Sequence, residues 1–237
     1  MRTYLSFLFL FCGLQITIAQ PLQHVVPEQA HPTPRIYTEH YYKRFIQFMD
    51  EAPISNKDIV MLGNSLTENG GNWAARLGNK HVRNRGIIGE GKVDEVMGVY
   101  DRLHQILPGH PAKLFLLIGV NDISHGLTSD SIVSMIRTTV ERIRKESPDT
   151  RLYLQSLLPI NESFGRYKRL TGKTSMIPEI NKQLEALAKE KGLTYINLFP
   201  LFTEKGSNVL RADLTTDGLH LKEEGYKIWV KAIKKKI

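Results

Sequence analysis

Short apolar runs alternate with longer stretches of helical periodicity along most of this chain. Each run is apolar on both faces, as in strands buried inside a parallel sheet. The runs lie at 59–62, 114–118, 152–158 and 193–198, and a further short strand is expected around Val82, before Gly86. Strands and helices that alternate in this way form a sheet covered on both sides. The sequence therefore predicts an α/β fold, a three-layer α/β/α sandwich around a central parallel sheet of about five strands.

Helical periodicity marks the segments between and after these runs. Helices are predicted at 93–107, 131–145, 179–191 and 222–235. A further amphipathic helix is predicted at 36–52, with an apolar side formed by Tyr42, Phe45, Ile46 and Met49. The segment before it contains four prolines, which predict an irregular lead-in: Pro21, Pro27, Pro32 and Pro34.

The first residues have the layout of a secretory signal peptide. Arg2 gives a positive start, an apolar run follows at 5–14, and small residues at 17–19 precede a cleavage point at Gln20. The run is too short to span a bilayer, which takes about 20 residues. A buried N-terminal helix is the alternative, but the run lacks a polar face. We expect a signal peptide at 1–19, a lead-in with a helix at 20–52, and the main domain at 53–237.

The only cysteine, Cys12, lies inside this apolar run. A lipid anchor at Cys12 would require small residues before it, and residues 9–11 are Phe, Leu and Phe. After cleavage the mature chain would contain no cysteine, which excludes disulfides and thiolate catalysis. We therefore expect an exported protein, periplasmic or secreted, whose mature chain has no integral membrane segment.

The formal net charge is +8, and basic residues are spread along the chain with one dense run at 231–236. A solvated basic surface explains this distribution better than a nucleic-acid partner does. The sequence contains no His-Glu-x-x-His motif and no cysteine cluster, so we expect neither a metal nor another cofactor.

Polar residues follow the apolar runs at the positions where a parallel sheet binds its ligands, outside the carboxyl ends of its strands. Ser65 comes directly after the run at 59–62, through Gly63 and Asn64. A serine at such a turn is exposed, and the start of the next helix favours negative charge beside it. The segment Ser65-Leu66-Thr67-Glu68 also fits a helix capping box, which is the purely structural alternative.

Asp217 and His220 lie three residues apart in a turn that contains a glycine. A histidine can take the proton of a serine hydroxyl, and a carboxylate can orient that histidine. One loop would thus supply both partners of Ser65. The alternative is an ordinary turn with Asp217 at a helix start and His220 at the surface.

An ester hydrolase also needs hydrogen-bond donors for the oxyanion of its tetrahedral intermediate. The backbone N–H of Gly89 and the side-chain amide of Asn121 follow predicted strands and suit this purpose. Each residue also suits a simple turn. Four unrelated turns at consecutive strand ends would be a coincidence, so a shared catalytic role explains Ser65, Gly89, Asn121 and the turn with His220 better.

Together these segments resemble the SGNH (GDSL-like) hydrolases, and among them the platelet-activating-factor-acetylhydrolase-like and carbohydrate-acetylesterase members. The matching segments occur in the family order and extend over 58 to about 230. They are Val60 to Thr67, Asn84 to Glu90, Ile118 to Asp122 and Asp217 to Leu221. An α/β-hydrolase is disfavoured, because it would have glycine where Thr67 stands.

The resemblance implies a flavodoxin-like SGNH hydrolase domain at 53–237 and a role for each matching residue. Ser65 would be the nucleophile, His220 the general base and then acid, and Asp217 the residue that orients His220. The backbone N–H groups of Ser65 and Gly89 and the side chain of Asn121 would form the oxyanion hole. The sequence departs from the family at Asn64, where an aspartate is usual.

The loop after the third long run, at 161–176, is expected to border this site and combines basic and aromatic residues. Candidate substrate contacts are Asn64, Asn161 and Arg166, while His125 is interpreted as a loop residue. We expect a serine esterase that removes short acyl groups, mainly acetyl, from carbohydrate. The alternatives are a lysophospholipase or small-lipid acylhydrolase, a non-catalytic carbohydrate-binding protein on the same fold, and an envelope scaffold.

Overall fold

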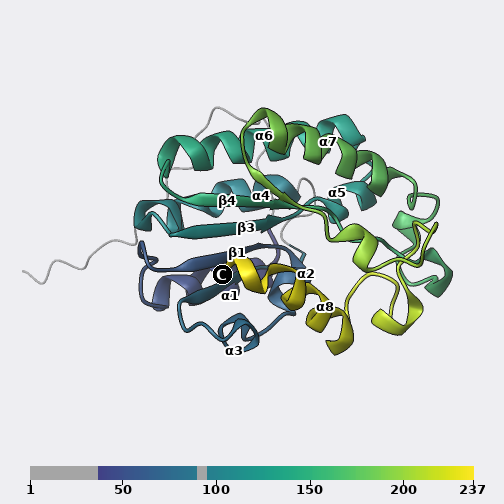
Figure 1. The fold of residues 1–237 in the computed structure, drawn as a ribbon, viewed down its shortest axis with the longest axis horizontal. Helices are drawn as coiled ribbons and strands as arrows, with labels where there is room; N and C mark the ends of the chain where they lie inside the picture. Colours follow the sequence, from purple (N-terminus) through teal and green to yellow (C-terminus); the bar gives the residue numbers. More distant parts are fainter. Residues whose placement is uncertain (1–36, 90–94) are drawn as a thin grey trace, which may run out of the picture. The chain divides into compact units, whose positions relative to one another are not determined.

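The computed structural model describes residues 37–89 and 95–237. The predicted signal peptide and the proline-containing lead-in lie outside the described residues. A parallel sheet of five strands forms the centre, in the order β2-β1-β3-β4-β5. Figure 1 labels its three middle strands, β1, β3 and β4. The strands are β1 (Ile59–Gly63), β2 (Val82–Gly86), β3 (Lys113–Leu117), β4 (Arg151–Gln155) and β5 (Thr194–Ile196). The predicted α/β class with a parallel sheet of about five strands is confirmed.

Alternate residues of the strands enter two separate cores, one on each face of the sheet. Val60 and Leu62 face a core shared with α4, α6 and α7. Ile59 and Met61 face a second core shared with α3 and α8. These helices are α3 (Trp73–Leu77), α4 (Glu95–Asp101), α6 (Ser129–Glu146), α7 (Met176–Glu190) and α8 (Glu223–Ile233). The strands are apolar on both faces because both faces are covered.

The chain leaves β1 toward one side of the sheet to form β2 and later returns to the other side to form β3. The register places Gly63, the last residue of β1, beside Gly86 of β2 and Leu117 of β3. A side chain at Gly63 would overlap the Leu117 carbonyl oxygen, so only glycine fits there. Three strand ends therefore meet at the point where the strand order reverses, which is where open α/β sheets bind ligands.

Two predicted elements end earlier than the apolar pattern indicates. The helix expected at 93–107 is α4 followed by 3₁₀ turns at Arg102–Gln105 and Leu107–Gly109, where Pro108 cannot donate a helical hydrogen bond. The strand expected at 152–158 ends at Gln155. Leu157 is fully buried outside the sheet, and its backbone N–H and C=O bond the side chain of Asn181 on α7 instead. Burial, rather than a strand ladder, explains the apolar residues beyond Gln155.

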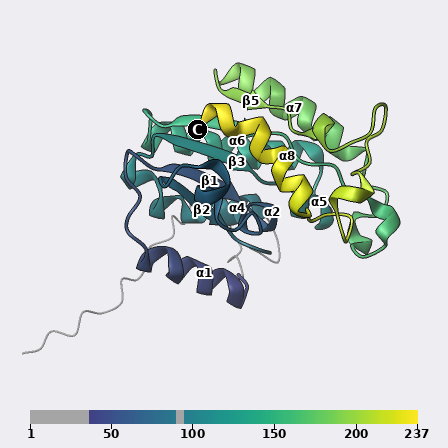
Figure 2. The ribbon, with the colours of Figure 1, turned by 60° about the horizontal axis from the view of Figure 1, so that its bottom comes forward.

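The predicted apolar side of the N-terminal helix is wrong for three of its four residues, and only Phe45 packs against the buried cluster. In α1 (Glu39–Asp50), Tyr42, Ile46 and Met49 are exposed, whereas Tyr41 and Phe48 are buried. The helix lies beside β2 (Figure 2) and packs Phe48 under the guanidinium of Arg85 at 4.5 Å. Apolar residues lie on two sides of this helix. Periodicity does not predict which of the two sides packs against β2, the polar edge strand of the sheet. Within the described ranges, no helix is both long and apolar enough to cross a membrane.

Candidate active site

Ser65 is the first residue of a short helix that begins where β1 ends. The helix α2 (Ser65–Glu68) has Asn64 as its N-cap, because the Asn64 Oδ1 accepts a hydrogen bond from Leu66 N at 3.0 Å. Ser65 therefore does not serve as the capping residue that the capping-box alternative requires. Its side chain instead contacts His220, with 2.9 Å between Ser65 Oγ and His220 Nε2. Two residues 155 positions apart thus meet in the folded chain.

Asp217 contacts His220 in two ways. Its Oδ1 accepts hydrogen bonds from the backbone N–H of Leu219 at 2.9 Å and of His220 at 2.8 Å, which closes a local turn. Its Oδ2 lies 2.8 Å from His220 Nδ1. One carboxylate oxygen therefore closes the turn, as the structural alternative expects, and the other oxygen contacts the imidazole.

The turn is held from behind by Thr215 and by the loop after β4. Thr215 Oγ1 donates to the His220 carbonyl at 2.7 Å and accepts from Gly218 N at 2.9 Å. Gly218 has a φ of 87°, and a Cβ there would overlap the Asn161 carbonyl oxygen. Asn161 N in turn donates to the Gly218 carbonyl at 2.8 Å. Only glycine allows the two loops to approach this closely.

Tyr167, in the loop after β4, adds a hydroxyl to the same carboxylate. Its Oη donates to Asp217 Oδ2 at 2.9 Å and lies 3.0 Å from His220 Nδ1. Burial tends to raise the pKa of the Asp217 carboxyl. Hydrogen bonds from His220, from the Leu219 backbone and from Tyr167 outweigh burial and lower this pKa from 3.8 to about 2. Burial and the neighbouring carboxylate raise the pKa of the Tyr167 hydroxyl, so the hydroxyl remains a donor.

Replacing Tyr167 by phenylalanine is expected to raise the pKa of Asp217 from about 2 toward 3.8, because the carboxylate loses one donor. A carboxylate with a lowered pKa stabilises the fold above its ordinary pKa, and this stabilisation is lost as the pH falls through its folded value. The difference in unfolding free energy between wild type and Y167F should therefore be largest above pH 4 and narrow toward pH 2. Carboxyl-carbon NMR titration of Asp217 measures the shift directly, and an unchanged pKa in Y167F would contradict it.

Asn121 and Gly89 follow the two strands that flank β1. Asn121 lies at the start of α5 (Val120–Ser124), shortly after β3, and its side-chain amide donates to Glu95 Oε1. Gly89 comes three residues after β2 and has a φ of 55°, a left-handed conformation that favours glycine. The backbone before it is fixed, because Ile87 N donates to the Gly63 carbonyl at 3.1 Å.

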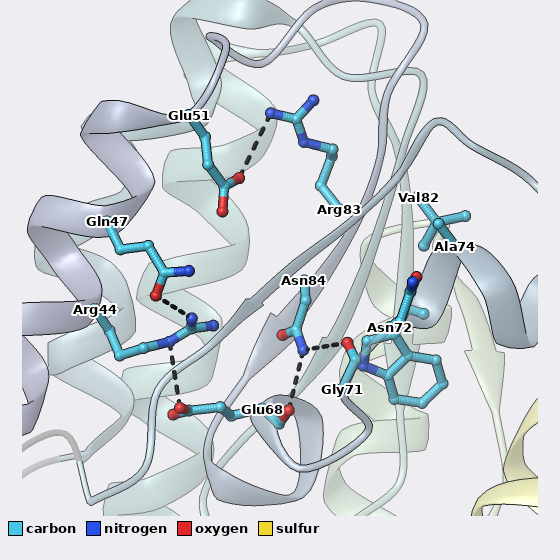
Figure 3. Close-up of a pocket in the computed structure, with 11 residues that line it drawn as sticks. Arg44, Gln47, Glu51, Glu68, Gly71, Asn72, Ala74, Val82, Arg83 and Asn84 are labelled. Carbon is cyan, nitrogen blue, oxygen red and sulfur yellow. Dashed lines mark hydrogen bonds and ion pairs between the residues drawn. The ribbon is translucent and has the colours of Figure 1, made fainter.

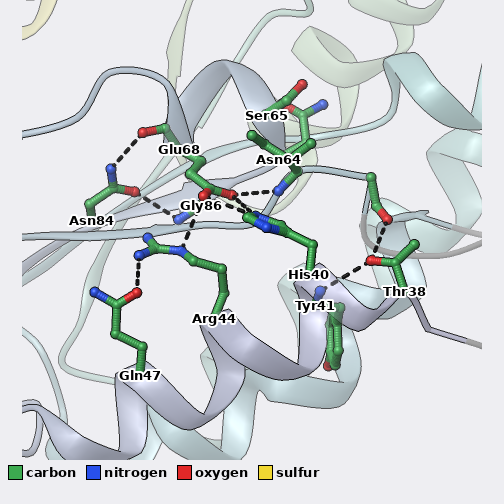
Figure 4. Close-up of polar contacts among 12 residues, drawn as sticks. Thr38, His40, Tyr41, Arg44, Gln47, Asn64, Ser65, Glu68, Asn84 and Gly86 are labelled. Carbon is green, nitrogen blue, oxygen red and sulfur yellow. Dashed lines mark hydrogen bonds and ion pairs between the residues drawn. The ribbon is translucent and has the colours of Figure 1, made fainter.

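Glu68, at the end of α2, holds the same loop against α1. Its Oε2 accepts from Ile88 N at 2.6 Å, and its carboxylate pairs with His40 at 3.0 Å and with Arg44 at 3.2 Å (Figure 4). Thr38, the N-cap of α1, donates to the Gly89 carbonyl at 3.4 Å. The N-terminal helix therefore braces the segment that ends at Gly89.

A polar pocket of about 410 Å³ lies between α1, β2 and the α2–α3 connection (Figure 3). Charged side chains that line it are already paired with one another. Arg44 contacts Glu68 at 3.2 Å, and Arg83 contacts Glu51 at 3.6 Å. The amide of Asn84 donates to two backbone carbonyls. The pocket wall thus belongs to the brace between α1 and the sheet.

The three candidate substrate contacts differ in exposure. Asn64 has no exposed surface, which contradicts its interpretation as a substrate contact. The Asn161 side chain already has partners within the protein: it donates to the Leu210 carbonyl at 2.9 Å and accepts from Ser163 N. Arg166 is exposed and adjoins Tyr167 in the chain. His125 caps the end of α5 through its backbone N–H. Among the described residues, no group of three or more His, Cys, Asp or Glu residues could hold a metal ion.

A protein-family comparison matches residues 61–228 to the GDSL-like Lipase/Acylhydrolase family. The chain belongs to this family. Membership makes it a carboxylic ester hydrolase by class. It is also 26% identical over 206 residues to a GDSL esterase/lipase of Oryza sativa subsp. japonica, covering 77% of this chain and 78% of the relative.

Solved structures of similar proteins share the fold of this GDSL-like chain. A GDSL-like lipase from Bacteroides thetaiotaomicron superposes with a TM-score of 0.70 at 22% identity, covering 83% of this chain and 96% of that one. A mutant acetyl-xylooligosaccharide esterase from Geobacillus Stearmophilus gives a TM-score of 0.59 at 17% identity, covering 77% and 94%. These likenesses establish the α/β/α architecture.

The sequence interpretation of this GDSL-like protein placed Tyr167 in a loop that borders the site without predicting its contacts, and it missed Glu95 as a neighbour of the site. In the sequence Tyr167 is one aromatic residue of a loop, although that loop follows a strand end. Glu95 lies on a predicted helix between two strands, and nothing in its spacing indicates that it is fully buried. In the sequence Glu95 directly follows Asp94 near the start of the predicted helix, so residue type alone does not single it out.

Proposed function

We propose that Ser65 is the nucleophile of a two-step acyl transfer, with His220 as general base and Asp217 as the residue that orients it. The observation that carries this proposal is the continuous series of contacts from Ser65 Oγ to His220 Nε2 at 2.9 Å and from His220 Nδ1 to Asp217 Oδ2 at 2.8 Å. A serine becomes nucleophilic when a neighbouring base accepts its proton, and a carboxylate holds that base in the correct tautomer.

In the first step the Ser65 oxygen attacks the ester carbonyl carbon while its proton passes to His220 Nε2. The tetrahedral oxyanion accepts hydrogen bonds from the backbone N–H groups of Ser65 and Gly89 and from the side-chain amide of Asn121. His220 then gives the proton to the departing alcohol, which leaves an acyl group on Ser65. In the second step a water molecule, deprotonated by His220, attacks this ester and releases the acid.

The proposed substrate is an acetyl ester on carbohydrate. Two of the structurally similar proteins are an acetyl-xylooligosaccharide esterase and an acetyl xylan esterase. Tyr167, whose hydroxyl bonds Asp217, lies in a loop that also contains the exposed side chains of Phe164 and Arg166. An exposed ring beside a guanidinium suits a sugar with a carboxylate, such as an acetylated uronic or sialic acid. A lysophospholipid or other small lipid ester is the competing substrate class.

Release of acetate from acetylated xylo-oligosaccharides, O-acetylated sialic acid and short-chain phospholipids, together with model esters of increasing acyl length, tests the substrate class. We expect kcat/KM to be highest for acetyl and to fall for butyryl and octanoyl, with acetylated sugars preferred over lipids. Faster turnover of octanoyl esters or of the phospholipid would favour the lipid alternative. Binding of the sugars without acetate release would instead favour the non-catalytic carbohydrate-binding protein.

We also propose that residues 1–19 are a signal peptide that directs export, that 20–52 form the lead-in with α1, and that 53–237 form the hydrolase domain. The support is the positive start and the short apolar run at 5–14. N-terminal sequencing of the mature protein from the cell envelope and the medium should begin at Gln20. A chain that retains Met1 in the cytoplasm would contradict export.

A further inference from the structure

A buried carboxylate joins two residues of the proposed catalytic centre. Glu95, the first residue of α4, has no exposed surface. Its Oε2 accepts a hydrogen bond from Asn64 Nδ2 at 3.3 Å, and its Oε1 accepts one from Asn121 Nδ2. Asn64 directly precedes Ser65, and Asn121 is the proposed side-chain donor of the oxyanion hole. One side chain therefore contacts the segments that follow both β1 and β3.

The contact with Asn121 decides where that amide points. A side-chain amide nitrogen carries two hydrogens, and one of them is donated to Glu95. The other hydrogen is thereby directed away from Glu95 and is available to a developing oxyanion. An oxyanion donor is effective only if it is already oriented before the charge forms.

The contact with Asn64 decides which side chain can stand before the nucleophile. As the N-cap of α2, Asn64 uses only its oxygen, which accepts from Leu66 N at 3.0 Å. Aspartate caps a helix as well as asparagine does, so the cap alone does not require an amide. The contact with Glu95 does require an amide, because the Asn64 Nδ2 donates to the Glu95 carboxylate. Two carboxylates in this buried place would repel, and one of them would have to take up a proton.

We infer that Glu95 is a positioning residue that orients the Asn121 amide toward the oxyanion and that requires an amide, in place of the aspartate usual in the family, at position 64. The inference rests on the proposed roles of Ser65 and Asn121. It also accounts for the one departure of the sequence from the family pattern around Ser65. The Glu95 carboxylate places its negative charge between two amides.

Exchanging the acid and the amide tests this pairing. In N64D, two carboxylates face each other. In E95Q, glutamine offers only one oxygen, so Asn64 or Asn121 loses its acceptor. In the double variant N64D/E95Q, the glutamine amide donates to the introduced aspartate while its oxygen accepts from Asn121, so both contacts are restored. The matched control is N72D, because Asn72 is the exposed N-cap of α3 and accepts from Ala75 N at 3.0 Å.

With p-nitrophenyl acetate as the probe, we expect N64D to lower kcat by about 10²-fold with KM changed less than about threefold, as for a poorly oriented oxyanion donor. E95Q should lower kcat by about tenfold, and the double variant should exceed N64D by at least about tenfold. N72D should match the wild type. If N64D and the double variant are equally impaired, or if N64D equals the wild type, the inference is overturned.

The pH profile separates positioning from a general structural defect. When the aspartate introduced in N64D is protonated, it can donate to Glu95 as the amide does. The deficit of N64D should therefore grow as the pH rises from 6 to 9, while that of the double variant should stay constant. Among the described residues, charged groups near the cluster include Asp122, which accepts from Val96 N, and Arg102, which donates to the Gly63 carbonyl. Both are present in all the variants. A pH-independent deficit in N64D would contradict the inference.

Thermal unfolding tests the pair without any reference to activity. N64D should unfold at a lower temperature than the wild type, and N64D/E95Q should recover most of the loss. If N64D does not fold, recovery of a folded double variant supports the pairing, and failure of both overturns it. Retained hydrolysis by S65A would defeat the proposed function alone, whereas an inactive S65A with an unimpaired N64D would defeat only the inference about Glu95.

Discussion

Replacing Ser65 by alanine is expected to lower kcat for acetyl ester hydrolysis by a factor on the order of 10⁶, as loss of the nucleophile does in other serine hydrolases. The reason is that the acyl group then has no side chain to which it can be transferred. Alanine removes one oxygen whose partner is His220 Nε2, so the fold should persist. Steady-state kinetics with p-nitrophenyl acetate measures the loss, and thermal unfolding verifies the fold.

Ser131 provides the matched control for this serine-to-alanine change. It lies on α6, and its Oγ contacts the exposed Thr128 Oγ1 at 2.9 Å rather than any residue of the candidate site. S131A should retain the wild-type kcat. Hydrolysis by S65A within about tenfold of the wild type would mean that another group carries the reaction.

Replacing Asp217 by asparagine is expected to lower kcat by about 10⁴ while leaving the turn intact. The asparagine oxygen can still accept from the backbone N–H groups of Leu219 and His220, as Asp217 Oδ1 does. The amide nitrogen would then face His220 Nδ1 as a donor. This favours the tautomer whose proton is on Nε2, and that tautomer cannot accept the proton of Ser65.

Asp213 is the matched control for Asp217, because it is an exposed acid in the same segment and pairs with Arg211 at 2.6 Å. D213N should retain nearly full activity, since exposed ion pairs contribute at most about 1 kcal/mol. The measurement is kcat at neutral pH for both variants. If D217N and D213N show equal activity, Asp217 does not orient His220.

The fold was predictable because both signals that specify it are local. Runs that are apolar on both faces indicate buried parallel strands, and the helices between them supply the two covering layers. The proximity of Ser65 and His220 was also predictable in outline, because carboxyl ends of parallel strands meet at one edge of the sheet. For α2 the sequence predicted only a helix start, and the short helix α5 was not expected, since four or five residues carry too little periodicity to reveal a helix.

Side-chain partners across the sheet were beyond the reach of the sequence pattern. Which face of α1 is buried depends on the polar edge strand beside it, and there the stripe with Tyr42 proved to be exposed. Tyr167 and Glu95 reach their partners 50 and 26 residues away, where no spacing rule applies. Asn64 was a visible departure from the family, but its physical reason required the position of Glu95.

The transfer of an acyl group to one serine oxygen is the central claim, and intact-mass and peptide mass spectrometry of protein quenched in acid during turnover of p-nitrophenyl acetate test it most directly. We predict that the wild type gains the mass of a single acetyl group, that this group lies on the peptide containing Ser65, and that S65A remains unlabelled. An acetyl group located on any other residue, or an S65A protein that is labelled and turns over like the wild type, would contradict the account.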